Sequence, residues 1–407
     1  MRAPRRLALA AALMGACSSD EPAPFPAFRH QELYERVQRE VREFTVVEGD
    51  WKEDYGDAPF YALGFLARAG ESDQNEEYRQ LARDVEPRNV AIVTERDLLH
   101  GDVNEILMSA LGLVEYMAAT GDGGDLAALD ELIDTINGLV AAVGYYLPAE
   151  AVPGYAMDTY GPTAVNALAA LLSLQRAWVL GGDRSQELVD WAAQVGEQIE
   201  QRAWNGTYYE FNDGDVRPGL FLYPNIAMII FESRLYQLTG DPATRDRALA
   251  TYEGIQPLAI TEDSGLEGPG RYRSPYSAEH MGARTDDYTT FSSQNYLILA
   301  LMLLYEITGD VSYVEQVDPV LDFLERDIHG PWCVSNFHRD PCEPACSDDG
   351  ACLEQSCVED TCGTATLHHW MDGAIAEPDD PEYVCSGCNY QLLYLMWYRQ
   401  NELPVRR

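Results

Sequence analysis

Four short turns with nearly the same sequence recur along the chain, about every 60 residues. They read Thr120-Gly121-Asp122, Gly181-Gly182-Asp183, Thr239-Gly240-Asp241 and Thr308-Gly309-Asp310. Each follows an apolar run and precedes a more polar one. Glycine accepts the left-handed conformation that ends a helix, and the aspartate can accept hydrogen bonds from the free N–H groups of the next helix. The turns therefore predict helical hairpins, and their fixed period predicts a repeat architecture.

Apolar residues recur with helical periodicity in pairs of segments. The pairs are 58–69 with 75–84, 103–119 with 126–143, 162–180 with 185–202, 225–238 with 243–252, and 292–307 with 311–326. The last segment, 388–401, has no partner after it, and we expect the first, 31–44, to pair with it and close a ring. The first member of each pair is apolar nearly all round, which indicates a buried helix, whereas the second has a polar face. This pattern predicts an all-α (α/α)6 toroid.

In its paired helices and hairpin spelling the chain resembles the six-hairpin glycosidase superfamily, including N-acylglucosamine 2-epimerase-like and mannanase-like relatives. The resemblance covers nearly all of the chain after its first residues and is one of architecture. No catalytic signature assigns one member family. The resemblance implies a toroid that acts on carbohydrate, but fold alone does not define a reaction.

The N-terminus has the features of a processing segment. Three arginines precede an apolar run, 7–14, which is too short to span a bilayer. It ends in Leu13-Met14-Gly15-Ala16-Cys17, which resembles the lipobox of bacterial lipoproteins, with Met14 where that family usually has leucine. The resemblance implies a signal peptide over 1–16, a lipidated Cys17, a tether over 17–30 and a folded domain over 31–407, in a bacterial cell envelope, periplasmic or surface-exposed. The alternative is an ordinary secretory signal that leaves Cys17 free to pair.

The number of cysteines supports export of the protein to an oxidising compartment. The chain has nine cysteines, and without Cys17 an even set remains, which predicts four disulfides in an oxidising compartment. These are Cys333, Cys342, Cys346, Cys352, Cys357, Cys362, Cys385 and Cys388. The segment 342–362 has almost no apolar residues and cannot form a core, so it must be held by bridges. We expect a cysteine-rich insertion over 333–362 that acts as a lid or a binding knob.

The strongly negative net charge of the chain limits the classes of molecule that it can bind. The chain has 28 Lys and Arg against 67 Asp and Glu, a net charge of −39. Such a surface repels nucleic acid and anionic lipid headgroups, so we expect no nucleic-acid partner and membrane contact only through the lipid anchor. Lys52 is the sole lysine and no glycine-rich phosphate loop is visible, so Schiff-base and P-loop chemistry have almost no residue to use. The histidines lack zinc spacing and the acids lack EF-hand spacing, so no metal or cofactor is expected.

The connections between hairpins are much longer than the turns inside them. They cover 144–161, 203–224, 261–291 and 329–387, and long loops in a domain are commonly functional. All of them lead to the N-terminal ends of the inner helices, where helix dipoles favour negative charge. Carboxylate, imidazole and aromatic residues precede these helices, a combination that suits a carbohydrate cleft. We therefore predict a central cleft at the long-loop end.

The predicted catalytic pair joins Asp286 or Asp287 to Asp57 or Asp102 across this cleft, as in a glycoside hydrolase. An aspartate before a helix can instead act only as a cap or face solvent. Other residues would stack on sugar rings or hold a uronic acid. These substrate-binding candidates are Tyr160, Tyr223, Arg271, Arg273, His280, Arg284, His369 and Trp370.

Two other functions fit the same sequence. A sugar epimerase or lyase would need a histidine or tyrosine base, with His100, His280 and His369 as candidates. A non-enzymatic surface lipoprotein would bind glycan or protein through the cleft and the insertion. A facing carboxylate pair favours the hydrolase, two facing histidines favour the epimerase, and a cleft filled by the insertion favours binding.

Overall fold

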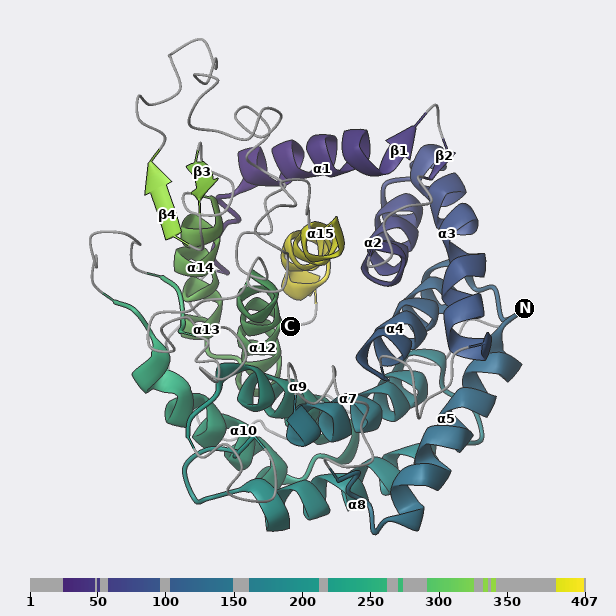
Figure 1. The fold of residues 1–407 in the computed structure, drawn as a ribbon, viewed down its shortest axis with the longest axis vertical. Helices are drawn as coiled ribbons and strands as arrows, with labels where there is room; N and C mark the ends of the chain where they lie inside the picture. Colours follow the sequence, from purple (N-terminus) through teal and green to yellow (C-terminus); the bar gives the residue numbers. More distant parts are fainter. Residues whose placement is uncertain are drawn as a thin grey trace, which may run out of the picture.

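Six apolar helices form a closed inner ring in the computed structural model (Figure 1). They are α2 (Ala58–Ser72), α4 (Val103–Thr120), α7 (Gly161–Gln175) with its π-helical extension η2 (Arg176–Leu180), α9 (Leu222–Thr239), α12 (Phe291–Thr308) and α15 (Ser386–Asn401). Each packs against the next in this order, and α15 packs against α2. The structure describes residues 25–47, 50–51, 58–95, 103–148, 161–211, 219–261, 270–273, 291–325, 332–335, 338–341 and 386–405.

The outer helices pack against this ring. They are α1 (Gln31–Thr45), α3 (Glu76–Glu95), α5 (Leu126–Ala142), α8 (Ser185–Ala203), α10 (Pro242–Ile255), and α13 (Ser312–Glu315) followed by α14 (Val317–Phe323). Short 3-10 turns, η3 (Gln256–Leu258) and η6 (Leu403–Val405), follow α10 and α15. The helices α3, α8 and α10, and the segment formed by α13 and α14, pack against the inner helix before them in the chain. The helix α5 packs against α3 and α7, and α1 packs against α15. The predicted (α/α)6 toroid is confirmed.

The inner helices are buried because the outer ring covers their backs. Every residue from Gly161 to Leu174 of α7 is buried, although a surface helix would expose one face. The continuous segment Gly161–Leu180 is long and apolar enough to cross a membrane, but 78% of its apolar window is buried inside the fold. A core helix satisfies the same criterion, and burial of this extent is what the inner ring requires.

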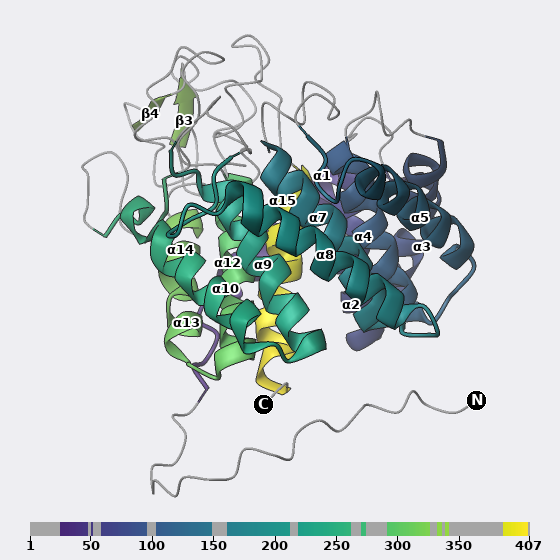
Figure 2. The same cartoon turned by 90° about the horizontal axis from the view of Figure 1, so that it is seen from below.

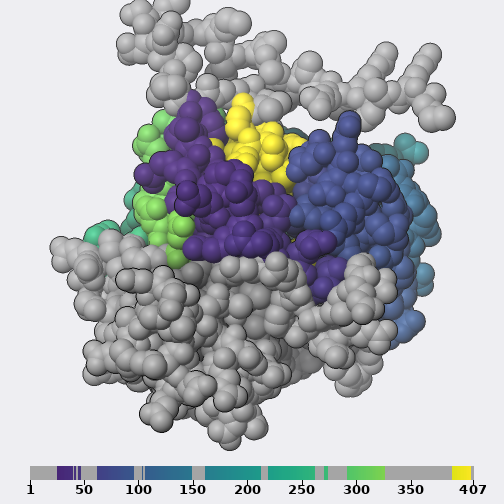
Figure 3. Space-filling view, turned by 90° about the horizontal axis from the view of Figure 1, so that it is seen from above, coloured from purple at the N-terminus to yellow at the C-terminus, as the bar shows by residue number. Residues whose placement is uncertain are grey.

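The ring closes where the first and last helices meet. Figure 3 shows α1 (purple) beside α15 (yellow), and α2 and α3 (blue) lie on the opposite side of α15 from α1. At this seam the Thr45 and Tyr390 hydroxyls share a buried hydrogen bond of 2.7 Å. The Tyr390 ring also packs near Phe65 of α2, with the ring centres 6.2 Å apart. The predicted pairing of the first segment with the last is therefore confirmed.

Packing on the toroid begins before α1. The Phe25 ring lies 5.5 Å from that of Tyr305 on α12, and the Arg399 guanidinium lies 4.5 Å from the centre of the Phe25 ring. Arg399 also donates a 2.9 Å hydrogen bond to the Pro26 carbonyl, and His30 is buried. The predicted tether boundary at residue 30 is therefore too late, because the chain already packs on the fold at Phe25.

All short turns lie at one end of the toroid. Seen from the side (Figure 2), the turns after α9 and α12 lie at the lower edge, where α15 also ends. The first glycine of each predicted turn has a positive φ, between 63° and 75°. Asp241 and Asp310 cap the next helix by accepting bonds from Ala243 and Ser312. Asp122 instead accepts from Gly124, and α8 begins without a side-chain cap.

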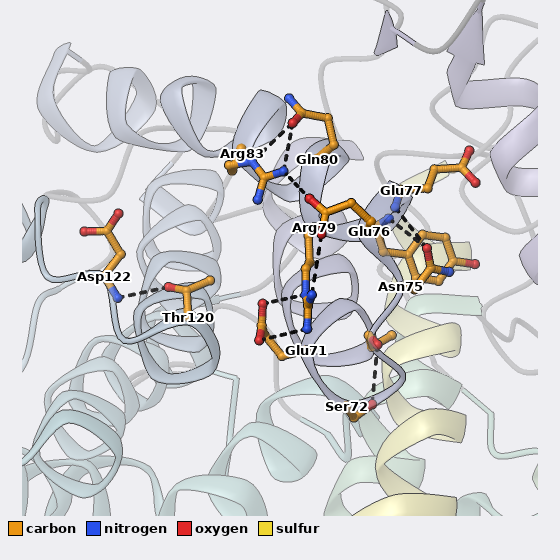
Figure 4. Close-up of polar contacts among 12 residues, drawn as sticks. Glu71, Ser72, Asn75, Glu76, Glu77, Arg79, Gln80, Arg83, Thr120 and Asp122 are labelled. Atoms are coloured by element: carbon orange, nitrogen blue, oxygen red, sulfur yellow. Dashed lines mark hydrogen bonds and ion pairs between the residues drawn. The ribbon is translucent and has the colours of Figure 1, made fainter. Parts of the chain in front are cut away.

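Threonine completes three of these turns. The Thr120 hydroxyl donates to the Tyr116 carbonyl and accepts from the Asp122 N–H (Figure 4). Thr239 and Thr308 repeat this arrangement. The turn between α2 and α3 uses a different residue, because the Asn75 side chain accepts from the N–H groups of Glu77 and Tyr78 (Figure 4).

In the described part of the chain, four short strands accompany the helices. β1 (Val46–Val47) pairs with β2 (Asp50–Trp51), and β3 (Trp332–Ser335) pairs with β4 (His338–Pro341), both antiparallel. The second hairpin lies at the start of the predicted cysteine-rich insertion, where the sequence suggested no regular structure. Cys388, in the first turn of α15, is buried and disulfide-bonded. The other cysteines have no described side chain, so a stapled insertion stays a prediction.

Candidate functional site

Buried amide side chains hold the chain at the long-loop end of the inner ring. Each lies in the first two turns of an inner helix and binds both backbone groups of one residue in the preceding connection. Asn166 binds Leu147, with distances of 2.8 and 3.0 Å. Asn225 binds Tyr209 at 2.7 and 2.9 Å, and Gln294 binds Tyr272 at 3.0 and 2.9 Å. We call these three residues the amide pins.

The amide pins fix the ends of loops that lead into the predicted cleft. Asn166, Asn225 and Gln294 are each 0% exposed. The hydrogen bonds to Tyr209 and Tyr272 are fully buried, so water cannot replace the amide there, whereas those to Leu147 are partly buried. The sequence signal is an Asn or Gln in the first two turns of an otherwise apolar helix. Sequence reasoning did not recognise this role.

Three of the predicted substrate-binding residues are described. Tyr223, in the first turn of α9, is buried, and its ring packs edge-on against Tyr296 of α12 at 5.3 Å. Arg271 is 2% exposed, and Arg273 is partly buried; both flank Tyr272, which pairs with Ala259. The structure therefore places Tyr223 at the top of the inner ring and the two arginines beside a pinned loop.

The remaining predicted site residues lie outside the described residues. These are Cys17, Asp57, Asp102, Tyr160, His280, Arg284, Asp286, Asp287, His369 and Trp370. His100, the other candidate base, lies outside them too. The facing carboxylate pair and the facing histidines stay predictions.

A buried carboxyl group lies behind one amide pin. Glu232 of α9 is 2% exposed and accepts a 2.6 Å hydrogen bond from the Tyr209 hydroxyl. Arg247 of α10 approaches the same carboxyl at 3.4 Å and also binds Glu200 of α8 at 3.0 Å. Burial raises the pKa of Glu232 to about 8, because desolvation outweighs the hydrogen bond and the nearby arginine. This group lies between the helix layers and joins α9 to the pinned loop.

A cavity of about 160 Å³ lies among the six inner helices. Its wall is mostly apolar and includes Leu168, Leu171, Ile230, Leu299 and Leu303. Its charged lining residues Arg68, Glu115 and Arg234 lie in the C-terminal halves of inner helices, toward the short-turn end, whereas Tyr296 and Gln391 lie in the N-terminal halves of α12 and α15. The 42% exposed Trp178 shows that this rim reaches solvent. We call this space the axial cavity.

Two groups of ion pairs and hydrogen bonds lie at the rim of the axial cavity. Arg68, Glu115 and Gln175 of the first group line the cavity, as do Arg234 and Tyr398 of the second. In the first, Arg68 of α2 binds Glu115 of α4 at 2.6 Å, and Gln175 of α7 donates to the same carboxylate at 3.3 Å. In the second, Gln237 of α9 donates to Glu306 of α12 at 2.7 Å.

The second group extends over a tryptophan. The Arg234 guanidinium lies 3.9 Å from Glu306 and 5.6 Å from the centre of the Trp178 ring. Tyr398 of α15 donates a hydrogen bond to Glu306. The rim thus offers aromatic faces and hydrogen-bonding groups whose charges are largely paired. Sequence reasoning missed it because these residues lie inside the apolar helices, where single Arg, Glu and Gln residues were the available signal.

Metal ligation gains no support from the described part of the chain. Within it, no three His, Cys, Asp or Glu side chains are grouped so that they could hold a metal ion.

Comparison with known proteins identifies the fold. No protein-family model matches the chain, and no curated protein matches its sequence. Solved structures do match. The GH76A α-1,6-mannanase from Salegentibacter sp. HEL1_6 is 12% identical, with a TM-score of 0.56, over 91% of this chain and 99% of that chain. An inactive variant of it with two adjacent aspartates changed to asparagine, solved with α-1,6-mannotriose, matches with a TM-score of 0.52 and 14% identity, over 91% of this chain and 98% of that chain.

Two further structures extend the comparison. An unsaturated glucuronyl hydrolase specific for heparin is 12% identical, with a TM-score of 0.58, over 91% of this chain and 97% of that chain. A sugar epimerase from a ruminal bacterium is 12% identical, with a TM-score of 0.55, over 85% of this chain and all of that chain. At this level of identity the match concerns the fold, and the chain has the six-hairpin glycosidase-like toroid fold that the sequence predicted.

Proposed function

We propose that this protein is a carbohydrate-active enzyme, a glycoside hydrolase that binds its substrate at the long-loop end of the toroid. The observation that carries the proposal is a six-hairpin ring whose inner helices all begin at the end where buried amides pin the loops. Mannanases, a glucuronyl hydrolase and a sugar epimerase share this fold. Parallel helix N-termini favour the negative charge of a carboxylate or of a developing oxyanion.

The proposed catalytic groups are Asp286 or Asp287 with Asp57 or Asp102. Two adjacent aspartates are the residues replaced in the inactive mannanase variant, and Asp286 and Asp287 are adjacent here. The two pairs occupy different places in their chains, so the parallel is one of chemistry and not of position. A raised pKa on one carboxyl would let it protonate the leaving group while the other acid activates water or attacks the sugar.

Epimerase or lyase chemistry is the second candidate. The sugar epimerase matches over all of its length, which makes its reaction a serious alternative for this scaffold. Such a reaction moves a proton next to a carbonyl and needs a base such as His100, His280 or His369. The third candidate is a non-enzymatic lipoprotein, which would bind its ligand in the predicted cleft but would not convert it.

The proposal includes export and anchoring. Cys17 follows an apolar segment and breaks the parity of the other cysteines, so we propose that it carries the lipid anchor. The Cys17→Ser variant should leave the membrane fraction after a salt and carbonate wash. Persistence of this variant in that fraction would exclude the anchor.

One screen separates the reactions. The protein is incubated with α-1,6-mannooligosaccharides, unsaturated uronides and reducing monosaccharides. New reducing ends report hydrolysis, and NMR of the sugars reports epimerisation. Asp→Asn substitution at 286, 287, 57 and 102 should lower hydrolysis by about 10²–10⁴-fold at the catalytic positions. Asn caps helices about as well as Asp, so stability should hold.

Asp190→Asn, on the exposed face of α8, is the matched control and should retain full activity. If all four variants hydrolyse at the wild-type rate, the assignment of catalytic residues is wrong. If no sugar is changed but oligosaccharides bind, the protein is a binding protein.

A further inference from the structure

The first described residues lie at the short-turn end of the toroid. The Phe25 ring contacts Tyr305, in the last turn of α12, and lies 4.5 Å from the guanidinium of Arg399, in the last turn of α15. Both helices end at the short turns, and Figure 2 shows this part of the chain (purple) at the lower edge, beside α13. The chain that follows the predicted tether therefore joins the fold at the short-turn end.

Residues 25–30, which we call the entry strap, are held on the fold by contacts with two helices. The Pro26 carbonyl accepts a 2.9 Å hydrogen bond from Arg399 of α15. Arg29 Nε donates a 2.9 Å hydrogen bond to the carboxylate of Asp318 on α14. Because the entry strap is attached at both places, a lipid anchor that holds the chain ahead of it also holds the toroid.

The chain between the proposed anchor and the entry strap is short. Cys17 precedes Phe25 by eight residues (25 − 17), a length that spans about 27 Å when fully extended and about 16 Å when relaxed. The inner helix α9 has 18 residues and is therefore about 27 Å long. If the long-loop end lay on the bilayer, Phe25 would stand about one helix length above it, and the tether would have to be fully extended. A relaxed tether instead keeps the short-turn end close to the bilayer.

The charge of the short-turn end does not attract it to the bilayer. The turns expose Asp122, Asp183, Asp241 and Asp310, and the chain as a whole has a net charge of −39. Anionic headgroups repel such a face, and this repulsion acts over about 10 Å in 0.1 M salt. The position of this end near the bilayer therefore depends on the length of the tether.

We propose that the short-turn end of the toroid faces the membrane that holds the Cys17 lipid, and that the long-loop end, with the proposed carbohydrate cleft, faces away from it. This orientation rests on the lipid anchor proposed above and on none of the proposed catalytic residues. A cleft on the far side of the toroid opens to the aqueous compartment, where soluble glycans reach it without crossing the space next to the bilayer.

The test measures energy transfer from the lipidated protein to acceptor-labelled headgroups in phosphatidylcholine vesicles. A fluorescent non-natural amino acid replaces one exposed residue at a time. Ala243 and Thr207 report the short-turn and long-loop ends near α9, and Gly123 and Val143 report the same two ends near α5. Because the ends of α9 are about 27 Å apart, transfer from position 243 should exceed that from position 207 by about twofold or more. Transfer from position 123 should likewise exceed that from position 143.

A longer tether should remove this difference. Twenty Gly and Ser residues inserted after Asp20 raise the relaxed reach of the tether to about 29 Å, so both ratios of transfer should fall toward one. The same twenty residues appended after Arg407 are the matched control and should leave both ratios unchanged.

The outcomes separate the orientation from the anchor and from the enzymatic activity. If the full chain does not bind the vesicles, both the anchor and the orientation are wrong. If it binds but transfer from the long-loop positions equals or exceeds that from the short-turn positions, the orientation alone is wrong. Unchanged ratios after the insertion at Asp20 would overturn the role of the short tether. If one labelled variant does not fold, the other pair of positions decides, and no step of the measurement requires a substrate.

Discussion

The two ends of the toroid reverse the chain by different physical means. At the short-turn end, residues within five positions of one another close each turn, as Thr239 does with Leu235 and Asp241. At the long-loop end, buried amides reach residues 16 to 22 positions away, from Asn225 to Tyr209 and from Gln294 to Tyr272. Local capping in solvent contributes little per residue, whereas a buried non-local bond has no water to replace it. The long-loop end should therefore be the more sensitive to single substitutions.

The largest contrast should come from two glycines. Gly270, at the long-loop end, has a φ of 102°, and a Cβ there would lie 2.1 Å from the Pro319 carbonyl oxygen. Gly309, at the short-turn end, has a φ of 75° and open space around it. Gly270→Ala should lower the free energy of unfolding by about 4 kcal/mol and Gly309→Ala by about 1 kcal/mol. Urea denaturation measures both, and similar losses would remove the contrast between the ends.

The next largest difference in the free energy of unfolding should come from two asparagines, one at each end of the toroid. Asn225→Ala leaves the buried N–H and carbonyl of Tyr209 unpaired and should cost about 3 kcal/mol. Asn75→Ala removes only a partly exposed helix cap and should cost about 1 kcal/mol. Thermal and urea unfolding of the two variants compare them directly. A larger loss at Asn75 would contradict the view that the amide pins dominate.

The buried carboxyl behind the Asn225 pin makes this end sensitive to pH. Burial raises the pKa of Glu232 to about 8 from an ordinary value of 4.5, so between these values the folded state binds more protons than the unfolded state. Stability from this group is complete below pH 4.5 and declines as the pH rises toward 8. The loss should be about 2 kcal/mol between pH 6 and pH 8.

Glu232→Gln isolates this contribution. The variant keeps an acceptor for the Tyr209 hydroxyl but does not titrate, so its stability should fall less over the same pH range. The difference between the two pH profiles is the measurement, since other groups titrate in both proteins. Parallel profiles would mean that Glu232 does not titrate there.

The smallest effect belongs to the threonine of a short turn. Thr239→Val keeps the shape of the side chain but removes the hydrogen bonds to the Leu235 carbonyl and the Asp241 N–H. Both backbone groups lie near solvent and can bind water instead, so the loss should be about 0.5 kcal/mol. A loss above that of Asn225→Ala, measured by urea denaturation, would reverse the proposed order of the two ends.

The sequence predicted the ring well because its signals are local. Apolar periodicity marks each inner helix, and glycine with aspartate marks each short turn, so the hairpins and even the pairing of the first and last helices could be inferred. The hydroxyl of Thr120 was overlooked, although its place before Gly121 repeats in two other turns. The tether boundary was also placed too late, since the aromatic contact of Phe25 with Arg399 joins residues far apart in the chain.

The site was harder to predict because its contacts are not local. An asparagine in an apolar helix signals a buried polar contact, but the sequence does not say that Asn166 holds Leu147. The rim of the axial cavity was missed because attention went to residues before the inner helices, whereas Arg68 and Arg234 lie inside them. The proposed catalytic aspartates stay predictions until the screen tests them.

Closure of the ring has a consequence for how this protein folds. The seam joins Thr45 to Tyr390 across 345 residues of sequence. Bringing the ends of so long a segment together costs about 5 kcal/mol of chain entropy. Until α15 is present, the hairpins can stack only as an open row, with the apolar flanks of α2 and α12 uncovered. We therefore expect a chain cut short before α15 to expose an apolar edge at each end of this row and to aggregate.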